Sequence, residues 1–476
     1  MDYNMTEIDR TEGMRKLLDL TLASGRVRQS PNTGFVHYTY HALDGEDRDS
    51  IPLVENFLFA LALLRMRTSE AVAEGKALLD KLLHFQNSDG QKANFPVYLH
   101  EYPECKDRYV AAHLLPIFYW VLKKFQQILG ADLRERMETT AQLLLAHCLQ
   151  NYQERVPGYS VAIKIAAAEQ AFAQLKEGSS DRLNDHLLES LRANAGSNWH
   201  CPTQIADTLV ALQMVYPTIS DSPWSPFWNA ICETWHRETC SYSGPAVKEL
   251  EAGFEPQATL YDLYLGYLSG KFSARALKGH PYQLQGALIQ SCSDPLINVP
   301  QKGYAFSLFV KEDNGDKGYY PFRLLWGNEK RVHTFACSKG NATLIEMRET
   351  SEEIELKFHL PDPVNLEERE KNRDVAFYMD LHEEIKLLIN GHASNTFRVG
   401  DLVSLSSGEL QISLKFSVEE GADAEFFGHW MLGNRPSQVS VKGENRFQAY
   451  DWQLFLRAVK RTGPCVVKVN VKINKI

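Results

Sequence analysis

Hydrophobic residues in the first half of the chain recur at spacings of three and four, which is the period of an amphipathic helix. A first stripe of this kind is formed by Leu53, Phe57, Leu61 and Leu64. A second runs from Ser69, the expected N-cap, to Phe85. Further stripes cover residues 106–129, 133–150, 161–175, 181–193, 202–215, 224–235, 255–268 and 274–289. The pattern predicts about ten to twelve helices that begin near Ile51.

These helical stretches alternate in character along the chain. Those that open at Ile51, Lys106, Val161, Pro202 and Glu255 are apolar and carry aromatic residues, whereas most of those between them have one charged side. An inner and an outer ring of helices, an (α/α) toroid, would produce this alternation, and so would a superhelical stack of helix pairs. The chain shows no strict repeat period, which favours the toroid.

After about residue 296 the hydrophobic period changes from that of a helix to two. Alternating stretches cover 304–310, 342–347, 354–358, 410–416 and 466–471, with turn-forming pairs such as Asn390-Gly391 and Ser407-Gly408 between them. Many short strands with this spacing indicate an antiparallel β-sandwich. We therefore predict a helical toroid over 1–295 and an antiparallel β-sandwich over 296–476. A length of 476 residues agrees with this division, because it exceeds what one core can use.

Net charge and hydropathy narrow the choice of partner. The formal net charge is −9 and the isoelectric point is near 6.0. A field of this sign repels phosphate backbones, so nucleic acid is not expected as a partner. An anionic polysaccharide would need a local basic or polar cleft. The longest apolar stretch, residues 57–64, is too short for a transmembrane helix, so no membrane association is expected.

Cysteine usage and the first residues favour a cytoplasmic location. The eight cysteines include no Cys-x-x-Cys pair and are expected to be reduced and mostly buried. Residues 1–20 lack the apolar core of a secretory signal. The sequence also lacks P-loop, dinucleotide-binding, zinc-protease and serine-hydrolase motifs, so we expect no cofactor and no metal site.

A first group of candidate site residues precedes the helix predicted over 106–129. Tyr98, His100 and Glu101 fall in the loop before this helix, and Arg108 falls in its expected first turn. An aromatic ring, an imidazole, a carboxylate and a guanidinium are groups that can bind and act on a polar substrate. A capping network around Asp107 would explain the same residues, and both interpretations stay open.

Further candidates lie later in the chain. Asn198, Trp199 and His200 form the end of the stretch Gly196-Ser-Asn-Trp-His200, just before the helix that begins at Pro202. Tyr261 and Tyr264 lie on the helix predicted over 255–268, where packing in the core is the competing explanation. Arg435 precedes a proline and is held extended, in a loop that either reaches the helical cleft or locks the domains together.

A helical ring followed by a β-sandwich is the layout of several polysaccharide lyases. The chain resembles the hyaluronate and chondroitin lyases, the alginate lyases and the heparinase-like enzymes in this order of domains. The stretch before Pro202 is similar to the Asn-Trp stretch that enters an inner helix in hyaluronate-type lyases. The resemblance implies that Asn198 neutralises a substrate carboxylate and that Trp199 forms a stacking wall. The chain departs from those exported enzymes because no His…Tyr…Arg run follows His200.

Three classes of function are compatible with these features. The first is a polysaccharide or oligosaccharide lyase, or a glycoside hydrolase, that acts in a cleft of the toroid. The second is a non-catalytic glycan-binding protein without a complete acid–base set. The third is a helical scaffold that binds a protein partner. For the first class we assign catalytic roles to His100, Asn198, His200 and Tyr261. We assign binding of an oligosaccharide or another small polar ligand to Tyr98, Glu101, Arg108, Trp199, Tyr264 and Arg435.

Overall fold

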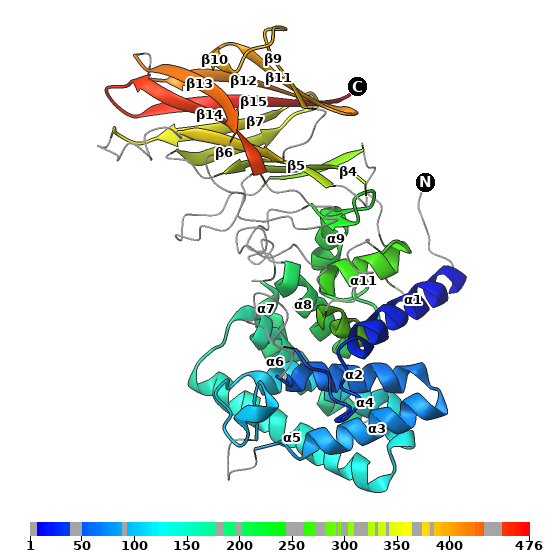
Figure 1. The fold of residues 1–476 in the computed structure, drawn as a ribbon. Coiled ribbons are helices and arrows are strands. Elements are labelled where there is room, and N and C mark those ends of the chain that lie inside the picture. Colours follow the sequence, from blue (N-terminus) through cyan, green and yellow to red (C-terminus); the bar gives the residue numbers. More distant parts are fainter. Residues whose placement is uncertain are drawn as a thin grey trace. The chain divides into compact units, whose positions relative to one another are not determined.

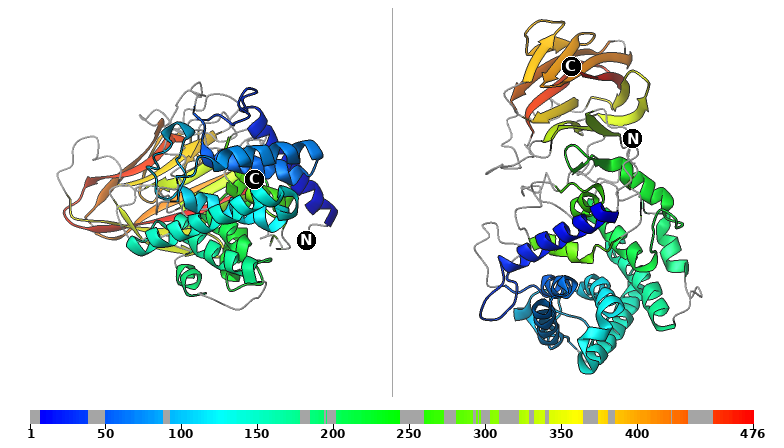
Figure 2. Two further views of the ribbon diagram at one scale, coloured as in Figure 1. Left: turned by 90° about the horizontal axis from the view of Figure 1, so that it is seen from below. Right: turned by 90° about the vertical axis from the view of Figure 1, so that its right-hand side faces the viewer.

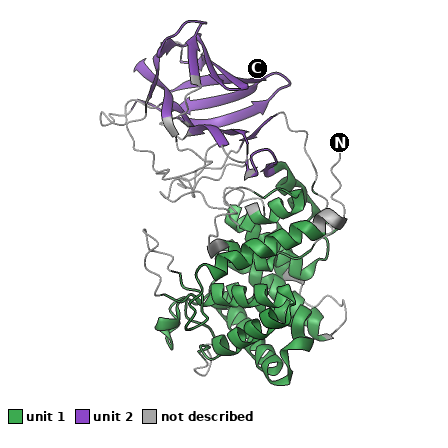
Figure 3. Ribbon diagram, turned by 45° about the vertical axis from the view of Figure 1, so that its right-hand side comes forward, with its two compact units in different colours: residues 1–233, 257–298 green, residues 234–256, 299–476 purple. Residues whose placement is uncertain are grey.

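The structure is a computed structural model of the 476-residue chain. It describes residues 7–38, 50–87, 93–177, 185–193, 195, 202–243, 260–272, 281–291, 294, 296, 303–308, 322–328, 332–338, 342–363, 374–380, 385–421, 423–432 and 450–476. The chain divides into two compact units, which Figure 3 shows in different colours. Unit 1 consists of Met1–Glu233 and Gln257–Asn298, and unit 2 of Thr234–Pro256 and Val299–Ile476. The short segment Thr234–Pro256, which lies between two parts of unit 1 in the sequence, thus belongs to unit 2.

Unit 1 is helical (Figures 1 and 2). Its α-helices are α1 (Glu7–Arg26), α2 (Leu53–Met66), α3 (Ser69–Leu83), α4 (Val110–Leu129), α5 (Ala131–Glu154), α6 (Tyr159–Glu177), α7 (Asp185–Arg192), α8 (Pro202–Val215), α9 (Ser225–Thr234) and α11 (Leu260–Ser269). Two 3₁₀ helices, η1 (Leu99–Glu101) and η4 (Pro281–Leu288), complete the described helical elements. The period of three and four therefore predicted helices where the structure has them.

Three details of the helices differ from the prediction. Helix α1 precedes the predicted start of the series at Ile51. The N-cap of α3 is Thr68 and not Ser69, because the Thr68 hydroxyl accepts a hydrogen bond from the Ala71 backbone N–H at 3.3 Å. The stretch predicted as a helix over 274–289 contains the 3₁₀ helix η4 in its described part.

Helices of unit 1 that follow one another in the sequence pack as pairs, and one helix of each pair also contacts the next pair. Helix α2 contacts α3, α4 contacts α5, and α6 contacts α7. Across the pairs, α2 contacts α4, α4 contacts α6, α6 contacts α8, and α8 contacts α11. Phe57 on α2 packs against Phe118 on α4, with ring centroids 5.3 Å apart. The helices that connect the pairs are therefore the apolar ones, as the alternation in the sequence indicated.

A buried asparagine on α2 holds the segment that precedes this helix. The Asn56 side chain is fully buried and accepts a hydrogen bond from the Val36 backbone N–H at 2.8 Å. Its amide nitrogen donates to the carbonyl oxygens of Val36, at 2.9 Å, and of Pro52, at 2.7 Å. One side chain thus satisfies three backbone groups that have no access to water.

Unit 2 is built of antiparallel strands. A hairpin of β1 (Trp235–His236) and β2 (Ser241–Tyr242) stands apart from the larger sheets in the pairing. The other described strands are β3 (Tyr304–Leu308), β4 (Phe322–Gly327), β5 (Val332–Ser338), β6 (Thr343–Glu349), β7 (Ile354–Leu360), β8 (Val375–Asp380), β9 (Ile385–Ile389), β10 (Thr396–Arg398), β11 (Leu402–Ser407), β12 (Leu410–Glu420), β13 (Glu425–Leu432), β14 (Tyr450–Lys460) and β15 (Cys465–Lys475). Within the described residues they form a seven-stranded sheet, β10-β13-β14-β8-β5-β4-β3, and a six-stranded sheet, β6-β7-β15-β12-β11-β9.

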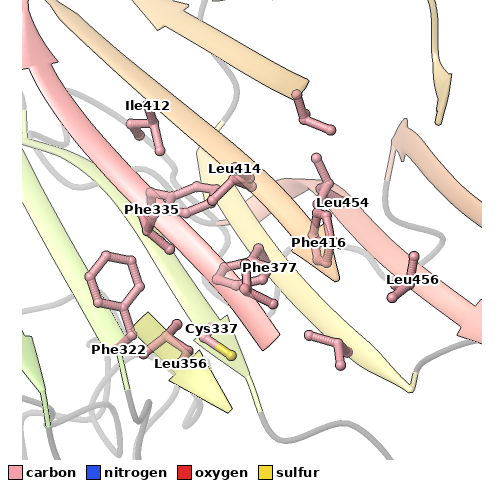
Figure 4. Packing of buried hydrophobic residues seen from close by; sticks show 14 of the residues in the cluster. Phe322, Phe335, Cys337, Leu356, Phe377, Ile412, Leu414, Phe416, Leu454 and Leu456 are labelled. Atoms are coloured by element: carbon pink, nitrogen blue, oxygen red, sulfur yellow. The ribbon is translucent and has the colours of Figure 1, made fainter. Parts of the chain in front are cut away.

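The two larger sheets share one hydrophobic core. Figure 4 shows side chains of the seven-stranded sheet, such as Phe335 and Phe377, beside those of the six-stranded sheet, such as Phe416. The Phe377 and Phe416 ring centroids are 6.3 Å apart. The Trp326 indole N–H donates across the core to the Ser407 hydroxyl at 3.1 Å. The sheets therefore pack face to face.

A glycine in β13 makes room for an aromatic ring of this core. Gly428 pairs with Phe397 of β10, and a Cβ atom at Gly428 would lie 2.1 Å from Cζ of the Phe397 ring. The ring is almost fully buried and stacks on Phe416, with centroids 5.2 Å apart. Since the ring is held from the other side, it cannot move away without disturbing the core.

Two further features concern the described residues only. No helix in them combines the length and the apolar character needed to cross a membrane. Their cysteines are free thiols, of which Cys105 is partly exposed and the rest buried: Cys148, Cys232, Cys240, Cys337 and Cys465.

We predict that Asn56→Ala destabilises the protein by about 2–4 kcal/mol, because the buried Val36 N–H and C=O lose their partners. Chemical denaturation followed by circular dichroism measures this change. The exposed Asn32 provides the control, since Asn32→Ala should change stability by less than about 0.5 kcal/mol. Equal effects of both variants would contradict the role assigned to Asn56.

We predict that Gly428→Ala lowers the stability of unit 2 by about 1–3 kcal/mol, because the new methyl group overlaps the Phe397 ring. Thermal unfolding monitored by near-ultraviolet circular dichroism detects the loss of aromatic packing. Gly463 has nothing within 4 Å of the position of a Cβ atom. Gly463→Ala is therefore the matched control and should be close to neutral. A neutral Gly428→Ala would show that the ring has room to shift.

Candidate functional site

The first two turns of α4, α6 and α8 bring three titratable side chains together. Lys164 of α6 lies between the other two. Its Nζ is 2.7 Å from Oδ1 of Asp207, on α8, and 3.0 Å from Nδ1 of His113, on α4. The Lys164 side chain is 7% exposed and that of Asp207 is 16% exposed. These three residues are called the Lys164 cluster below.

The helices that carry the cluster run side by side in the same direction. Each of the three residues lies in the first two turns of its helix. Farther along, the Tyr119 hydroxyl of α4 donates to the Met214 carbonyl oxygen of α8 at 2.8 Å. The contacts at Lys164 and the contact between the middle of α4 and the end of α8 thus fix how the two helices are aligned, and their N-terminal ends meet at α6.

The start of α4 is held by a second buried asparagine. The Asn94 side-chain oxygen accepts from the Ala111 N–H at 2.9 Å, and its amide donates to the Asp107 carbonyl oxygen at 2.8 Å. The Asp107 carboxylate accepts from the Tyr109 N–H at 2.8 Å. These bonds satisfy N–H groups at the helix start that have no partner inside the helix. They also place His113, which follows one turn into α4.

Burial of the Lys164 ammonium makes a carboxylate partner necessary. A buried charge is costly unless it is paired. Asp207 supplies the opposite charge from the second turn of α8. The Lys164 charge, together with burial, lowers the pKa of His113 to about 3. The imidazole is therefore neutral near pH 7.

Other polar groups surround the cluster at the starts of α6 and α8. Burial raises the pKa of the Tyr159 hydroxyl above its usual range, and a hydrogen bond with Thr208 opposes this shift. The Thr208 hydroxyl donates to the Gln204 carbonyl oxygen at 2.9 Å. Among the described residues, Oε1 of Gln204 is buried without a hydrogen-bond partner. The region therefore combines phenol, amide, imidazole and carboxylate groups.

The predicted residues before α4 lie at the start of α2. A bridge between Pro52 and Tyr98 places them there. The buried Tyr98 ring stacks on the exposed His100 ring, with centroids 5.6 Å apart and an angle of 11° between the planes. The Glu101 carboxylate accepts from the Tyr98 backbone N–H at 3.2 Å and lies 3.9 Å from Lys106 Nζ. Glu101 thus caps η1, while His100 faces solvent.

Arg108 lies just before α4 and not in its first turn, because the helix begins at Val110. Its guanidinium lies 4.0 Å from the Glu154 carboxylate, and both side chains are more than half exposed. Its carbonyl oxygen is 3.2 Å from Nε2 of His147. Arg108 therefore links the start of α4 to the end of α5.

Tyr261 and Tyr264 are fully buried in unit 1. The Tyr261 hydroxyl donates to the Ile231 carbonyl oxygen at 3.2 Å, and the Tyr264 hydroxyl accepts from the Gln213 amide at 2.7 Å. In this conformation neither ring is accessible to a ligand, because each is packed in the core. Their catalytic and binding roles stay predictions that this packing does not support.

Asn198, Trp199, His200 and Arg435 lie outside the described residues. Lys164 and Asp207 belong to no motif that the sequence shows. The signal that could have found Lys164 is its place in an apolar helix, Val161-Ala-Ile-Lys-Ile-Ala-Ala-Ala168. A lysine inside such a stretch is rarely buried unless it is paired.

Metal binding has no support from the described residues, since they contain no group of three or more His, Cys, Asp or Glu side chains placed to hold an ion. No family model and no curated protein matches the chain. The chain is similar to a solved structure of heparinase III, with 8% sequence identity and a TM-score of 0.42, over 99% of this chain and 86% of that chain. It is also similar to a second heparinase III gene product, with 9% identity and a TM-score of 0.33, over 99% of this chain and 85% of that chain. Likenesses at this level assign no role to any residue of this chain.

The lowered pKa of His113 predicts a specific dependence of stability on pH. Between about pH 6.5 and pH 3 the unfolded chain binds a proton at this residue and the folded chain does not. Stability therefore falls as the pH drops through this window. Between pH 7 and pH 5 the loss due to His113 is about 1–2 kcal/mol. His113→Gln removes this contribution, so the variant should lose less stability than wild type over the same range.

Urea denaturation at pH 7 and pH 5 measures the difference. Asn32, which is exposed and carries no titratable group, is the control, and Asn32→Ala should keep the pH dependence of the wild type. Parallel behaviour of His113→Gln and wild type would show that Lys164 does not disfavour protonation of His113.

Proposed function

We propose that the chain is a carbohydrate-active protein with a helical toroid and a β-sandwich, which binds an oligosaccharide at the N-terminal ends of α4, α6 and α8. The order of helix contacts supports the toroid. It runs from α2 through α4, α6 and α8 to α11, and α1 contacts both α11 and α2, which closes the order. The face-to-face packing of the two sheets supports the sandwich.

The observation that carries the proposed site is the Lys164 cluster. Saccharides are recognised by a small number of directional hydrogen bonds in a concave site, combined with aromatic faces. The starts of α4, α6 and α8 offer an imidazole, a phenol, an amide and a carboxylate in one place. The predicted residues Asn198, Trp199 and His200 come just before Pro202 in the sequence, and we include them in the proposed site.

The leading hypothesis for activity is a lyase or hydrolase that acts on oligosaccharides. Elimination from a uronide requires a group that neutralises the carboxylate, a base and an acid, and these groups must converge on one cleft. Asn198 and His200, together with His100, are the residues proposed for these roles. A cytoplasmic location remains a prediction.

A second candidate, a non-catalytic glycan-binding protein, is favoured by one observation. A general base works best when its pKa lies near the pH of the reaction. The pKa of His113 is lowered to about 3, and Lys164 is paired with Asp207, so neither group is suited to remove a proton near pH 7. An absorbance assay on uronide oligosaccharides separates the two candidates, because elimination creates an absorbing double bond and binding alone does not.

We predict that Trp199→Ala and His200→Ala each weaken binding to an oligosaccharide identified on a glycan array by at least about tenfold. The melting temperatures should stay close to that of wild type, because these residues are proposed to face the ligand. His84→Ala is the control for both measurements. If binding falls only in step with the melting temperature, the two residues are core residues and the proposed site is wrong.

A further inference from the structure

A lysine ammonium next to an imidazole nitrogen determines where the imidazole carries its proton. Lys164 Nζ is 3.0 Å from Nδ1 of His113. An ammonium group has only donors, so Nδ1 must be the acceptor and carries no proton. In a neutral imidazole the proton is then on Nε2. The contact therefore selects one of the two tautomers of His113.

The geometry of the cluster keeps the ammonium in this role. Asp207 Oδ1, 2.7 Å from Nζ, supplies the negative charge that a buried ammonium requires. The two residues come from different helices, so the position of the ammonium is set from both sides of α6. Lys164 has little exposed surface and cannot exchange its partners for water.

We propose that Lys164 and Asp207 are positioning residues that hold His113 as a neutral imidazole with its proton on Nε2, and that this N–H is the donor to a neutral hydroxyl oxygen of the oligosaccharide. This inference rests on the proposed function for the identity of the ligand. Because Nδ1 is engaged by Lys164, Nε2 is the ring nitrogen that we propose meets the ligand, and His113 as a residue is partly exposed.

The charges of the cluster indicate the class of saccharide. The Lys164 ammonium is balanced by Asp207, and His113 carries no charge, so the three groups together are neutral. The three groups therefore offer no net positive charge to attract the carboxylate of a uronide. A hydroxyl oxygen of a neutral sugar needs only the directed N–H donor. Beside the beginning of α4, α5 contributes His147 and Glu154, both linked to Arg108. Helix α2, which also contacts α4, carries the buried Glu55 in its first turn. The site thus favours a neutral oligosaccharide, which agrees with the hydrolase and the binding protein among the proposed functions and not with a uronide lyase.

Nitrogen NMR of the protein labelled with ¹⁵N-histidine tests the tautomer directly, with His113→Gln used to assign the signals. In wild type, His113 should show an unprotonated Nδ1 and a protonated Nε2, unchanged from pH 5 to pH 8. In Lys164→Met the ring should titrate within this range, because the neighbouring positive charge is gone. If Lys164→Met fails to fold, the double variant Lys164→Met/Asp207→Asn takes its place, because it removes both charges of the buried pair. A wild-type His113 that titrates within this range, or that carries its proton on Nδ1, overturns the inference.

Binding of two probes tests the ligand class. Cellohexaose and its C6-oxidised uronate form differ only in hydroxymethyl and carboxylate groups. Wild type should bind cellohexaose more tightly, and His113→Leu should weaken this binding about 3–10-fold, the loss of one hydrogen bond. Tighter binding of the uronate form, or unchanged binding by His113→Leu, overturns the assignment of His113 while the proposed function stands. If wild type binds neither probe nor any array glycan and the tautomer is as expected, the proposed function fails and with it the glycan part of the inference.

Discussion

Burial of one positive charge is the constraint on which the arrangement of α4, α6 and α8 depends. The Lys164 ammonium lies among apolar residues of α6, and a charge in such a place costs several kcal/mol unless it is paired and hydrogen-bonded. Asp207 meets this requirement from α8 and His113 from α4. Because the distances are short, shifting α6 or α8 by one turn would separate the ammonium from its carboxylate, and shifting α4 would remove its imidazole acceptor. The requirement therefore selects one alignment of the helices and places their N-terminal ends together.

Unit 1 uses the same device, a buried polar side chain that satisfies the backbone of a distant segment, at several of its connections. Asn56 and Asn94 hold the chain before α2 and before α4. The Asp294 carboxylate accepts from the backbone N–H groups of Ile219 and Ser220, at 3.0 and 2.6 Å. The Arg65 guanidinium of α2 donates to the carbonyl oxygens at the end of η4. Loops that lack regular hydrogen bonds are thereby given a defined position, and the starts of the helices become rigid enough to carry a site.

Hydrophobic periodicity was informative wherever an element has one buried and one exposed side. It predicted β7, whose residues alternate strictly between buried and partly exposed. It did not indicate β4, where Phe322 to Trp326 are all buried and no alternation exists. The N-cap of α3 was misplaced by one residue, since Thr68 and Ser69 both have capping hydroxyls and only the backbone conformation distinguishes them. Tyr261 and Tyr264 carry polar groups that suit a site, yet their hydroxyls are satisfied inside the core.

The sequence by itself determined which part of the chain is helical and which part is built of strands, because helix and strand periods are local properties of the chain. The apolar stretch around Lys164 also indicates that this lysine needs a partner if it is buried. Only the tertiary structure decided which partners it has. His113 lies 51 positions away along the chain, and Asp207 lies on a third helix. Such pairs form because helices that are distant in the sequence pack side by side. The hydrophobic period of one helix does not show which side chain of another helix it will meet.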